Sequence, residues 1–321
     1  MDPLVVAIVP TWNRRAEVVD CVASLLASDY GDLAIVVVDN GSVDGTGEAL
    51  AQRYGEAITV LRNETNLGYA GGNNRGIRWA LDRGARYVCL VNNDARVSAG
   101  FVRAMVDVAR GDDRIGALGC RNLELEDPTR LWGAYGELTY GPFVVRMAGQ
   151  GAADGERWWI RRDVDWVIGN GSLWSCAAIG AVGLLDEDFF AYHDDVDWSV
   201  RFHRGGYRVH YAGDISILHR GGGTSDIREE HVFPLPYFLG RNGVLFARKH
   251  AAPADLLRYA FWSTAAMLGR WVRAGAARLL PFAPQRDRQG HRYWDWEVSY
   301  ARGVLDGLRG RPAAAAVVQR R

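Results

Sequence analysis

The sequence predicts an α/β protein built on a largely parallel sheet and followed by a helical extension. Short apolar segments rich in Val, Ile and Leu alternate with segments of helical periodicity through the first 120 residues, a pattern typical of repeated βαβ units. The chain has 321 residues, 48% of them hydrophobic, which is enough to bury a full core and argues against disorder. Polar residues follow several expected strands directly, where open α/β sheets bind their ligands.

Five apolar segments are expected to form buried strands. They are residues 4–9, 34–38, 58–61, 87–91 and 115–119. Four segments between them are expected to form helices, because each has helical spacing and is flanked by Gly, Asp, Asn or Ser. They are residues 16–27, 45–54, 72–83 and 99–109.

The second half of the chain has a different pattern. Residues 164–168 and 208–212 resemble further strands and indicate a mixed extension of the sheet. Two apolar stripes at helical spacing follow Pro253 and predict amphipathic helices. The stripes are Leu257, Phe261, Leu268, Val272 and Leu279, and then Trp294, Val298, Ala301, Leu305 and Leu308. We therefore expect one domain of residues 1–250 and a helical extension of residues 251–321.

Basic residues are concentrated in this extension. The whole chain has 38 basic and 38 acidic residues, but residues 251–321 carry 12 basic and only 5 acidic ones. Such a segment can bind an anionic surface, although a solvated helical face explains the charge equally well. Its longest uncharged segment, residues 259–269, is too short to cross a bilayer.

The cysteine pattern indicates a reducing compartment. The four cysteines, at positions 21, 89, 120 and 176, form neither a paired metal-ligand spacing nor a dense disulfide framework. The chain enters its first expected strand at Leu4 without the basic and apolar segments of a signal peptide. We expect a cytoplasmic protein.

Polar motifs follow the second and third expected strands. Asp39, Asn40 and Ser42 end the second strand, where a carboxylate can accept hydrogen bonds from a base or a ribose. The same residues are common in turns and helix caps. Residues 66–76 place four glycines and three asparagines at a helix start, where phosphates bind. Tight packing of a helix on the sheet is the alternative explanation of these glycines.

These glycines match neither a dinucleotide-binding fingerprint nor a P-loop. The sequence therefore disfavours a hydride-transfer enzyme and an NTPase.

Two acidic motifs are candidates for catalysis and metal binding. Asn92, Asn93 and Asp94 end the fourth expected strand, and a divalent cation could bind there if a pyrophosphate and a further residue such as His219 complete its shell. Asp194, Asp195 and Asp197 lie within four positions, and repulsion between carboxylates raises a pKa as a general base requires. Acids at a helix start also stabilise the helix dipole, which alone could explain Asp197.

The motifs, in their order and spacing, resemble family 2 of the inverting glycosyltransferases. The matching segments are residues 8–13, 38–46, 66–76, 91–94 and 186–201. A bacterial rhamnosyltransferase-like branch is more similar still, because an Asn-x-Asp element and an acidic pair after Phe-Phe-x-Tyr are typical of it. The pair Arg241 and Asn242 also resembles the end of that branch. The resemblance covers about residues 4–250.

This resemblance implies a GT-A fold, a Rossmann-like nucleotide-binding mixed sheet, in the catalytic domain of residues 1–250. It implies direct displacement at the anomeric carbon of a nucleotide sugar, assisted by Mg²⁺ or Mn²⁺. The implied metal ligands are Asp94, His219 and Asn92, the last in place of the usual Asp. Asp195 would be the catalytic base, and Asp194 stands where the family has Glu.

The resemblance also assigns residues to the two substrates. The donor nucleotide and its pyrophosphate would contact Pro10, Thr11, Asn13, Asp39, Asn40, Ser42, Asn66, Gly68, Gly71, Asn74, Asn93, Arg220 and Arg241. Aromatic faces cover the apolar faces of sugars, so candidates for the acceptor side are Trp166, Asn170, Trp174 and Tyr192. The two tryptophans could equally belong to the core.

The implied reaction transfers L-rhamnose from dTDP-rhamnose, or a sugar from a UDP-sugar, to a glycan or lipid-linked glycan in cell-surface polysaccharide synthesis. A sugar nucleotidyltransferase and a non-catalytic sugar-binding or scaffold protein are the alternatives. For residues 251–321 we weigh attachment to an anionic membrane at the inner face of the plasma membrane against packing on the catalytic domain or on a second subunit of a homodimer. We expect no nucleic-acid partner.

Overall fold

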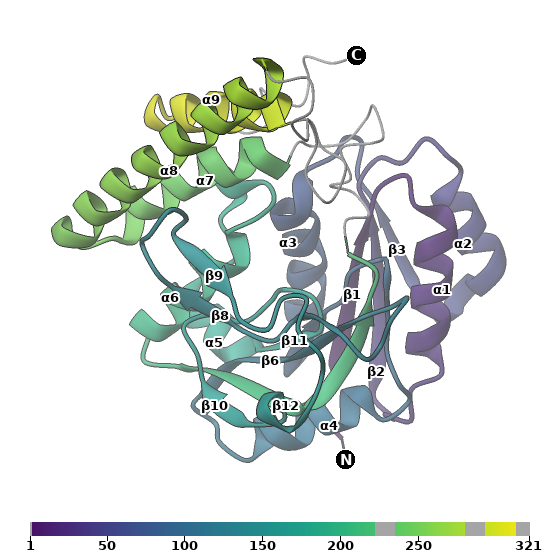
Figure 1. Cartoon of the computed structure of the whole chain (residues 1–321). Coiled ribbons are helices and arrows are strands. Elements are labelled where there is room, and N and C mark those ends of the chain that lie inside the picture. Colours follow the sequence, from purple (N-terminus) through teal and green to yellow (C-terminus); the bar gives the residue numbers. More distant parts are fainter. Residues whose placement is uncertain (1, 222–234, 280–292, 313–321) are drawn as a thin grey trace. The chain divides into compact units, whose positions relative to one another are not determined.

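The computed structural model describes residues 2–221, 235–279 and 293–312 (Figure 1). The chain divides into two compact units. The first comprises Met1–Glu137, Met147–Phe190 and Asp194–Gly221, and the second comprises Leu138–Arg146, Ala191–His193 and Gly222–Arg321.

The first unit is built on a mixed sheet whose parallel half has the strand order β3, β2, β1, β4. These strands are β1 (Val5–Thr11), β2 (Leu33–Asp39), β3 (Thr59–Arg62) and β4 (Tyr87–Leu90). Strands β1 and β4 are buried along their whole length, as expected for parallel strands covered on both faces. The first four predicted strands are confirmed.

The other half of the sheet is mixed, as predicted. Strand β11 (Ser172–Ser175) lies antiparallel between β4 and β6 (Ile115–Glu124), and β12 (Arg208–His219) lies parallel to β6. The remaining strands of this sheet are β5 (Ala95–Arg96), β7 (Leu131–Gly133) and β10 (Arg161–Asp163), and β8 (Gly136–Leu138) pairs with β9 (Val145–Met147) in a separate sheet.

The prediction of a strand over residues 164–168 is wrong. Only Trp166 forms a bridge there, with Gly136. Four of the five residues are nevertheless buried, because their apolar side chains pack into the core without joining a strand ladder.

Helices cover both faces of the sheet (Figure 1). One face packs against α1 (Arg15–Leu26), α2 (Thr46–Tyr54) and α4 (Phe101–Arg110), and the other against α3 (Gly68–Leu81), α5 (Cys176–Val182) and α6 (Asp194–Arg204). Short 3₁₀ helices are η1 (Gly55–Ala57), η2 (Glu156–Trp158) and η3 (Glu187–Phe189). The predicted helices are confirmed, except that α3 begins at Gly68, four residues earlier than expected.

The glycines of α3 allow the helix to lie close to the sheet. A Cβ on Gly76 would lie 2.5 Å from Ile8 Cγ2, and one on Gly72 would lie 2.7 Å from Asn40 Nδ2. Real side chains do not approach so closely. The packing explanation is therefore correct for these two glycines.

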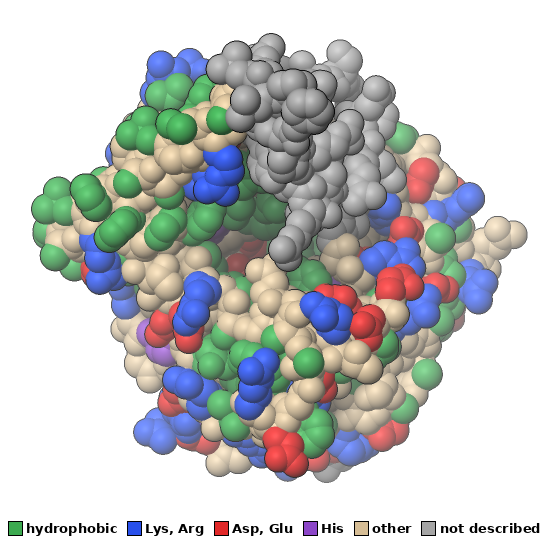
Figure 2. Space-filling model, viewed as in Figure 1, with side chains coloured by type: hydrophobic (Ala, Val, Ile, Leu, Met, Phe, Trp, Pro, Cys, Tyr) green, Lys and Arg blue, Asp and Glu red, His purple; other side chains and the backbone are tan. Residues whose placement is uncertain are grey.

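The second unit contains α7 (Leu235–His250), α8 (Pro253–Leu279) and α9 (Tyr293–Leu308), so both predicted amphipathic segments are helical. Phe238, Phe246, Tyr259 and Tyr300 are buried within it, while hydrophobic side chains gather on the outside of α8 (Figure 2). None of the helices in the described ranges is both long enough and apolar enough to span a membrane. Helix α7 groups with the C-terminal helices, and a domain boundary after His250 stays a prediction.

Candidate active site

The first candidate residues lie where β1 and β2 end side by side. Pro10 and Thr11 close β1, and Thr11 is paired in register with Asp39. All three residues are buried. Thr11 Oγ1 accepts a hydrogen bond from Asn93 Nδ2 at 2.9 Å, so the end of β1 is also tied to the segment after β4.

The loops after β1 and β2 hold each other through side chains. The Asn13 backbone N–H donates to Ser42 Oγ at 2.9 Å, and Asn13 Oδ1 accepts from the Val43 N–H at 2.8 Å. Asp39 Oδ1 accepts from the Ser42 N–H at 2.9 Å. Asp39 Oδ2 is buried, accepts no hydrogen bond from any described residue and lies 3.9 Å from Arg62 Nε. This oxygen is therefore the one that a ligand donor could satisfy.

Asn40 connects β2 to the glycine-rich segment. Its Nδ2 donates to the Gly68 carbonyl at 3.0 Å, and its Oδ1 accepts from Asn63 Nδ2 at 2.7 Å. Both ends of this buried amide are therefore bonded to the protein itself, which orients the segment that begins α3.

The start of α3 packs on the chain just before the acidic cluster. Asn66 Oδ1 accepts from the Gly68 N–H at 2.9 Å, and Gly68 has a φ of +75°. A Cβ on Gly68 would overlap the Phe190 carbonyl oxygen, and one on Gly71 would lie 2.7 Å from Leu67 Cβ. Only glycine fits at position 68, because both the φ angle and the close approach exclude a side chain.

Asn74 of α3 is bonded to the segment that leads into η3. Its Nδ2 donates to the Leu185 carbonyl at 2.9 Å and to Glu187 Oε1 at 2.8 Å, and its Oδ1 accepts from the Leu185 N–H at 3.0 Å. The structure therefore brings Asn74 to residues 185–187 rather than to the loops after β1 and β2.

The three predicted metal ligands come together at the ends of β4 and β12. His219 Nε2 lies 3.2 Å from Asp94 Oδ1 and 3.2 Å from Asn92 Nδ2. Burial opposes ionisation of Asp94, but the hydrogen bond and charge of His219 outweigh it and hold the pKa of this carboxyl below its ordinary value. Asp94 is therefore ionised at neutral pH.

The donor set fits a divalent cation. Asn92 Oδ1 and His219 Nδ1 are buried and have no hydrogen-bond partner among the described residues. Carboxylate and amide oxygens suit Mg²⁺ or Mn²⁺. In the described part of the chain no group of three His, Cys, Asp or Glu side chains is placed to hold a metal ion. A cation here would take further oxygens from water or from a substrate such as a pyrophosphate.

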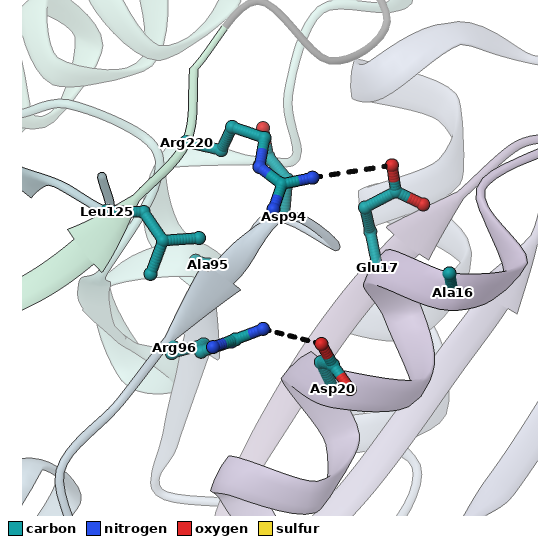
Figure 3. Close-up of a pocket in the computed structure, with 8 residues that line it drawn as sticks. All are labelled: Ala16, Glu17, Asp20, Asp94, Ala95, Arg96, Leu125 and Arg220. Carbon is teal, nitrogen blue, oxygen red and sulfur yellow. Dashed lines mark hydrogen bonds and ion pairs between the residues drawn. The ribbon is translucent and has the colours of Figure 1, made fainter.

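Arg220 follows these ligands in the chain and lies beside them. Its backbone N–H donates to the Asp94 carbonyl at 3.2 Å. Its guanidinium lies 3.8 Å from Glu17 and 3.3 Å from Glu126, measured between the nearest nitrogen and oxygen. Arg220, Glu17 and Asp94 line a cavity of about 140 Å³ (Figure 3). Arg96 and Asp20 also line this cavity and form an ion pair with each other.

Arg241 lies in the second unit. It is buried, and its guanidinium donates to the Arg311 carbonyl at 3.0 Å and to Asn242 Oδ1 at 2.7 Å. Its role at the pyrophosphate stays a prediction.

The candidate base is held by backbone amides. Asp195 Oδ2 accepts from the Gly169 N–H and Oδ1 from the Val196 N–H, both at 2.9 Å. Burial raises the pKa of Asp195 to about 6, although these hydrogen bonds act in the opposite direction. A carboxylate with such a pKa is an efficient proton acceptor near neutral pH. Its neighbour Asp194 is buried at the start of α6.

Tyr69 and Gly169 belong to this site and have no role in the sequence prediction. Tyr69 Oη is buried without a hydrogen-bond partner among the described residues. Burial and then the charges of Asp194, Asp195 and Asp94 raise the Tyr69 pKa well above its ordinary value. A Cβ on Gly169 would lie 3.0 Å from Tyr69 Oη. No sequence signal separates Tyr69 from a core aromatic residue, because only the fold brings it beside the acids.

Asp197 has a structural role. Its Oδ2 accepts from Arg201 Nε at 2.8 Å, one helical turn later, and is fully buried. The same guanidinium donates to the carbonyls of Val182 and Leu184 at 3.2 and 2.7 Å. Asp197 lies in the first turn of α6 and its side chain forms an ion pair with Arg201, while its effect on the helix dipole stays a prediction.

Three of the four acceptor candidates are buried in the first unit. Trp174 is fully buried and stacks on Trp198 with ring centroids 4.1 Å apart, and Trp166 packs on Gly136. Both tryptophans belong to the core. Asn170 is also buried, and its Oδ1 accepts from the Asn92 N–H at 2.9 Å, so it holds the segment that follows β4. Tyr192 lies in the second unit.

The chain belongs to glycosyl transferase family 2, whose family model matches residues 6–169. It is 31% identical over 220 residues to the N-acetylglucosaminyl-diphospho-decaprenol L-rhamnosyltransferase of Mycobacterium tuberculosis, covering 61% of this chain and 69% of the relative. It is 27% identical over 226 residues to a galactofuranosyltransferase of the same organism, covering 69% and 72%.

Solved structures confirm the predicted GT-A fold. A mannosyltransferase from Pyrobaculum calidifontis, in complex with GDP-Man and Mn²⁺, aligns with a TM-score of 0.59 at 17% identity, covering 96% of this chain and 88% of that one. The structure of GalNAc-T7 with UDP, GalNAc and Mn²⁺ aligns with a TM-score of 0.55 at 13% identity, covering 68% of this chain and 44% of that one.

Proposed function

We propose that this glycosyltransferase transfers a sugar from a nucleoside diphosphate donor with inversion, using Asp195 as the base and a divalent cation held by Asp94, His219 and Asn92. One observation carries the proposal. Two consecutive residues join the two sets: the Gly169 N–H donates to Asp195 Oδ2, and Asn170 Oδ1 accepts from the Asn92 N–H, both at 2.9 Å. This geometry supports a base with a raised pKa and a cation-binding donor set in one site.

The proposed donor is dTDP-rhamnose, with a UDP-sugar as the second candidate. The relative with 31% identity is named for L-rhamnosyl transfer to N-acetylglucosaminyl-diphospho-decaprenol, which supports a lipid-linked glycan acceptor in cell-surface polysaccharide synthesis. The free thiols of all four cysteines, each buried, support a reducing, cytoplasmic location.

The chain's residues have distinct parts in this reaction. Asp195 accepts the proton of an acceptor hydroxyl while the hydroxyl oxygen bonds to the anomeric carbon of the donor sugar. The bond between that carbon and the diphosphate oxygen breaks in the same step. A single displacement inverts the configuration. Asp39 and the loops after β1 and β2 orient the nucleoside, and Arg220 adds positive charge beside the diphosphate. The cation, when bound, supplies further charge to the leaving diphosphate.

The decisive experiment incubates the purified full chain with Mn²⁺, dTDP-rhamnose or UDP-sugars, and a synthetic N-acetylglucosaminyl-diphospho-polyprenol. We expect equimolar release of nucleoside diphosphate and glycosylated lipid, with inverted configuration by NMR. A parallel incubation with dTTP or UTP and a sugar 1-phosphate tests the alternative reaction, because release of inorganic pyrophosphate there would identify a nucleotidyltransferase. Donor binding without turnover on any acceptor tested would favour a non-catalytic protein.

A further inference from the structure

Helix α8 presents an exposed apolar stripe along most of its length. Leu257, Phe261, Leu268 and Val272 are 72%, 65%, 58% and 73% exposed. Ala254, Thr264 and Ala265 lie between them on the same side of the helix and are also exposed. The stripe therefore contains no charged residue over about five helical turns (Figure 2).

The opposite side of α8 is the side that packs within its unit. Tyr259 and Ala274 are buried there. Arg270 Nε lies 2.8 Å from Glu297 Oε1 of α9, and its guanidinium lies 4.8 Å from the centroid of the Tyr300 ring. The stripe is thus not needed to attach α8 to α7 and α9, and a contiguous exposed apolar patch is typical of an interaction surface.

The flank of the stripe indicates what kind of surface covers it. Arg258, Trp262 and Arg273 lie along one side of the stripe and are all exposed. Apolar side chains bordered by basic and aromatic ones match the boundary between acyl chains and anionic headgroups.

The charge of the extension favours the same partner. Of its 5 acidic residues, Glu297 and Asp306 are buried and paired with Arg270 and Arg311. Asp255 pairs with Arg258 at 3.2 Å, whereas Arg273 and Arg302 are exposed, as is Asp295. Over the whole extension basic residues outnumber acidic ones, 12 to 5. A second copy of this chain would bring a like-charged flank against it, whereas an anionic lipid surface would neutralise it.

We propose that this face of α8 docks on the surface of an anionic bilayer. The helix axis lies parallel to the membrane plane, the apolar stripe enters the headgroup region, and Arg273 contacts lipid phosphates. The Arg258 guanidinium instead bonds to the Thr139 carbonyl at 2.8 Å and to Asp255 at 3.2 Å. This binding is independent of the proposed sugar transfer, and each of the two can fail without the other.

The test measures sedimentation of the full chain with phosphatidylcholine vesicles that contain or lack phosphatidylglycerol. We expect binding that requires phosphatidylglycerol and weakens with salt. Phe261→Gln combined with Leu268→Gln should weaken partitioning at least roughly tenfold, because two apolar side chains no longer enter the bilayer. Arg273→Gln should weaken binding about fivefold, and only on anionic vesicles.

Leu26→Gln is the matched control. Leu26 is an exposed leucine at the end of α1 in the first unit, and its replacement should leave binding unchanged. Circular dichroism and transfer to a water-soluble acceptor analogue establish that each variant is folded. If the double variant does not fold, Leu257→Gln and Val272→Gln as single changes supply the same comparison.

Three results would overturn the proposal. They are equal recovery in the supernatant with and without phosphatidylglycerol, undiminished vesicle binding by the stripe variants, and a dimer in sedimentation velocity that depends on the stripe while vesicles are not bound. The last result would assign the face to a second copy of the chain.

Discussion

At the scale of single residues, the carboxylate of Asp195 is the group on which the proposed chemistry depends. The backbone N–H groups of Gly169 and Val196 each donate to one of its oxygens. Because backbone groups do not titrate, the position of this carboxylate does not depend on the charge of another side chain. Replacing it by Asn keeps the shape of the side chain but removes its capacity to accept a proton.

Asp195→Asn should therefore lower turnover by about 10²- to 10⁴-fold, the usual contribution of a general base, while donor affinity stays within about twofold. Steady-state assays and donor titration measure the two quantities. Asp188→Asn, a change at an exposed acid on η3, should have nearly wild-type turnover. Retention of more than roughly a tenth of wild-type turnover in Asp195→Asn would show that another group is the base.

The raised pKa of Asp195 predicts the acid limb of the pH profile. The base must be ionised to act, and burial raises its pKa to about 6. Turnover at saturating donor should therefore be nearly constant above about pH 7 and fall about tenfold per pH unit well below pH 6. A wild-type profile that stays flat to about pH 5, or the same acid limb in the residual activity of Asp195→Asn, would contradict the assignment.

Asp94 should control the response of the donor to metal. Asp94→Asn removes a charged oxygen ligand beside His219, so Mn²⁺ should no longer strengthen nucleoside diphosphate binding, a loss of at least roughly tenfold. Calorimetric titration with Mn²⁺ and with EDTA measures the effect. Asp20→Asn, at another acid that lines the same cavity and pairs with Arg96, should keep the metal response. An unchanged metal response in Asp94→Asn would remove Asp94 from the metal site.

At the scale of elements, the segment that leads into α6 is strained. Phe190, Tyr192 and His193 have φ angles of +63°, +65° and +65°, and each such non-glycine residue costs on the order of 1–3 kcal/mol. Within the second unit, Asn242 Nδ2 of α7 donates to the carbonyls of Ala191 and Tyr192, both at 2.8 Å. A buried side chain of α7 thus holds the residues that immediately precede the acidic pair in the chain.

Asn242→Ala should lower turnover more than donor affinity, because the segment before Asp194 loses the side chain that holds it. It should also destabilise the fold by about 1–3 kcal/mol, since two carbonyls lose their donor. Separate determination of kcat and KM, together with thermal unfolding, tests both effects. Arg248→Gln breaks contacts of α7 with the carbonyls of Gly307 and Leu308 and should affect stability only. Equal effects of both variants on kcat would mean that Asn242 acts through stability alone.

At the scale of the whole molecule, the candidate donor residues occupy mainly the first unit. Nucleoside diphosphate with Mn²⁺, at about one hundred times its Kd, should stabilise the folded state by about 2.7 kcal/mol. Hydrogen exchange should slow in residues 39–43, 66–70 and 92–95 and stay unchanged in α8. Slower hydrogen exchange in α8 alone would show that the nucleotide does not bind at the ends of β1, β2 and β4.

Much of the fold could be predicted from the sequence, because its strands and helices are specified by local periodicity. The runs from Val5 and Leu33 read as buried strands, and the stripe from Leu257 reads as one long helix. The polar residues after β1, β2 and β4 could be placed at one edge of the sheet for the same reason, since the carboxyl ends of parallel strands share that edge. His219, 127 positions after Asn92, could be named as a candidate ligand from its residue type and from the family resemblance, although periodicity does not connect it to Asn92.

Only the tertiary structure decided which of these residues meet and which are covered. Strand β11 enters the sheet antiparallel between β4 and β6, Trp174 lies in the core, and Asn74 bonds to residues 185–187. Tyr69 lies beside the acids, and the stripe on α8 stays exposed. The physical reason is that periodicity reports the face that one segment buries, whereas its neighbours depend on packing between segments distant in the chain. The sequence by itself determined the strands, the helices and the edge of the sheet where the candidate site lies. Packing between distant segments determined which residues belong to that site.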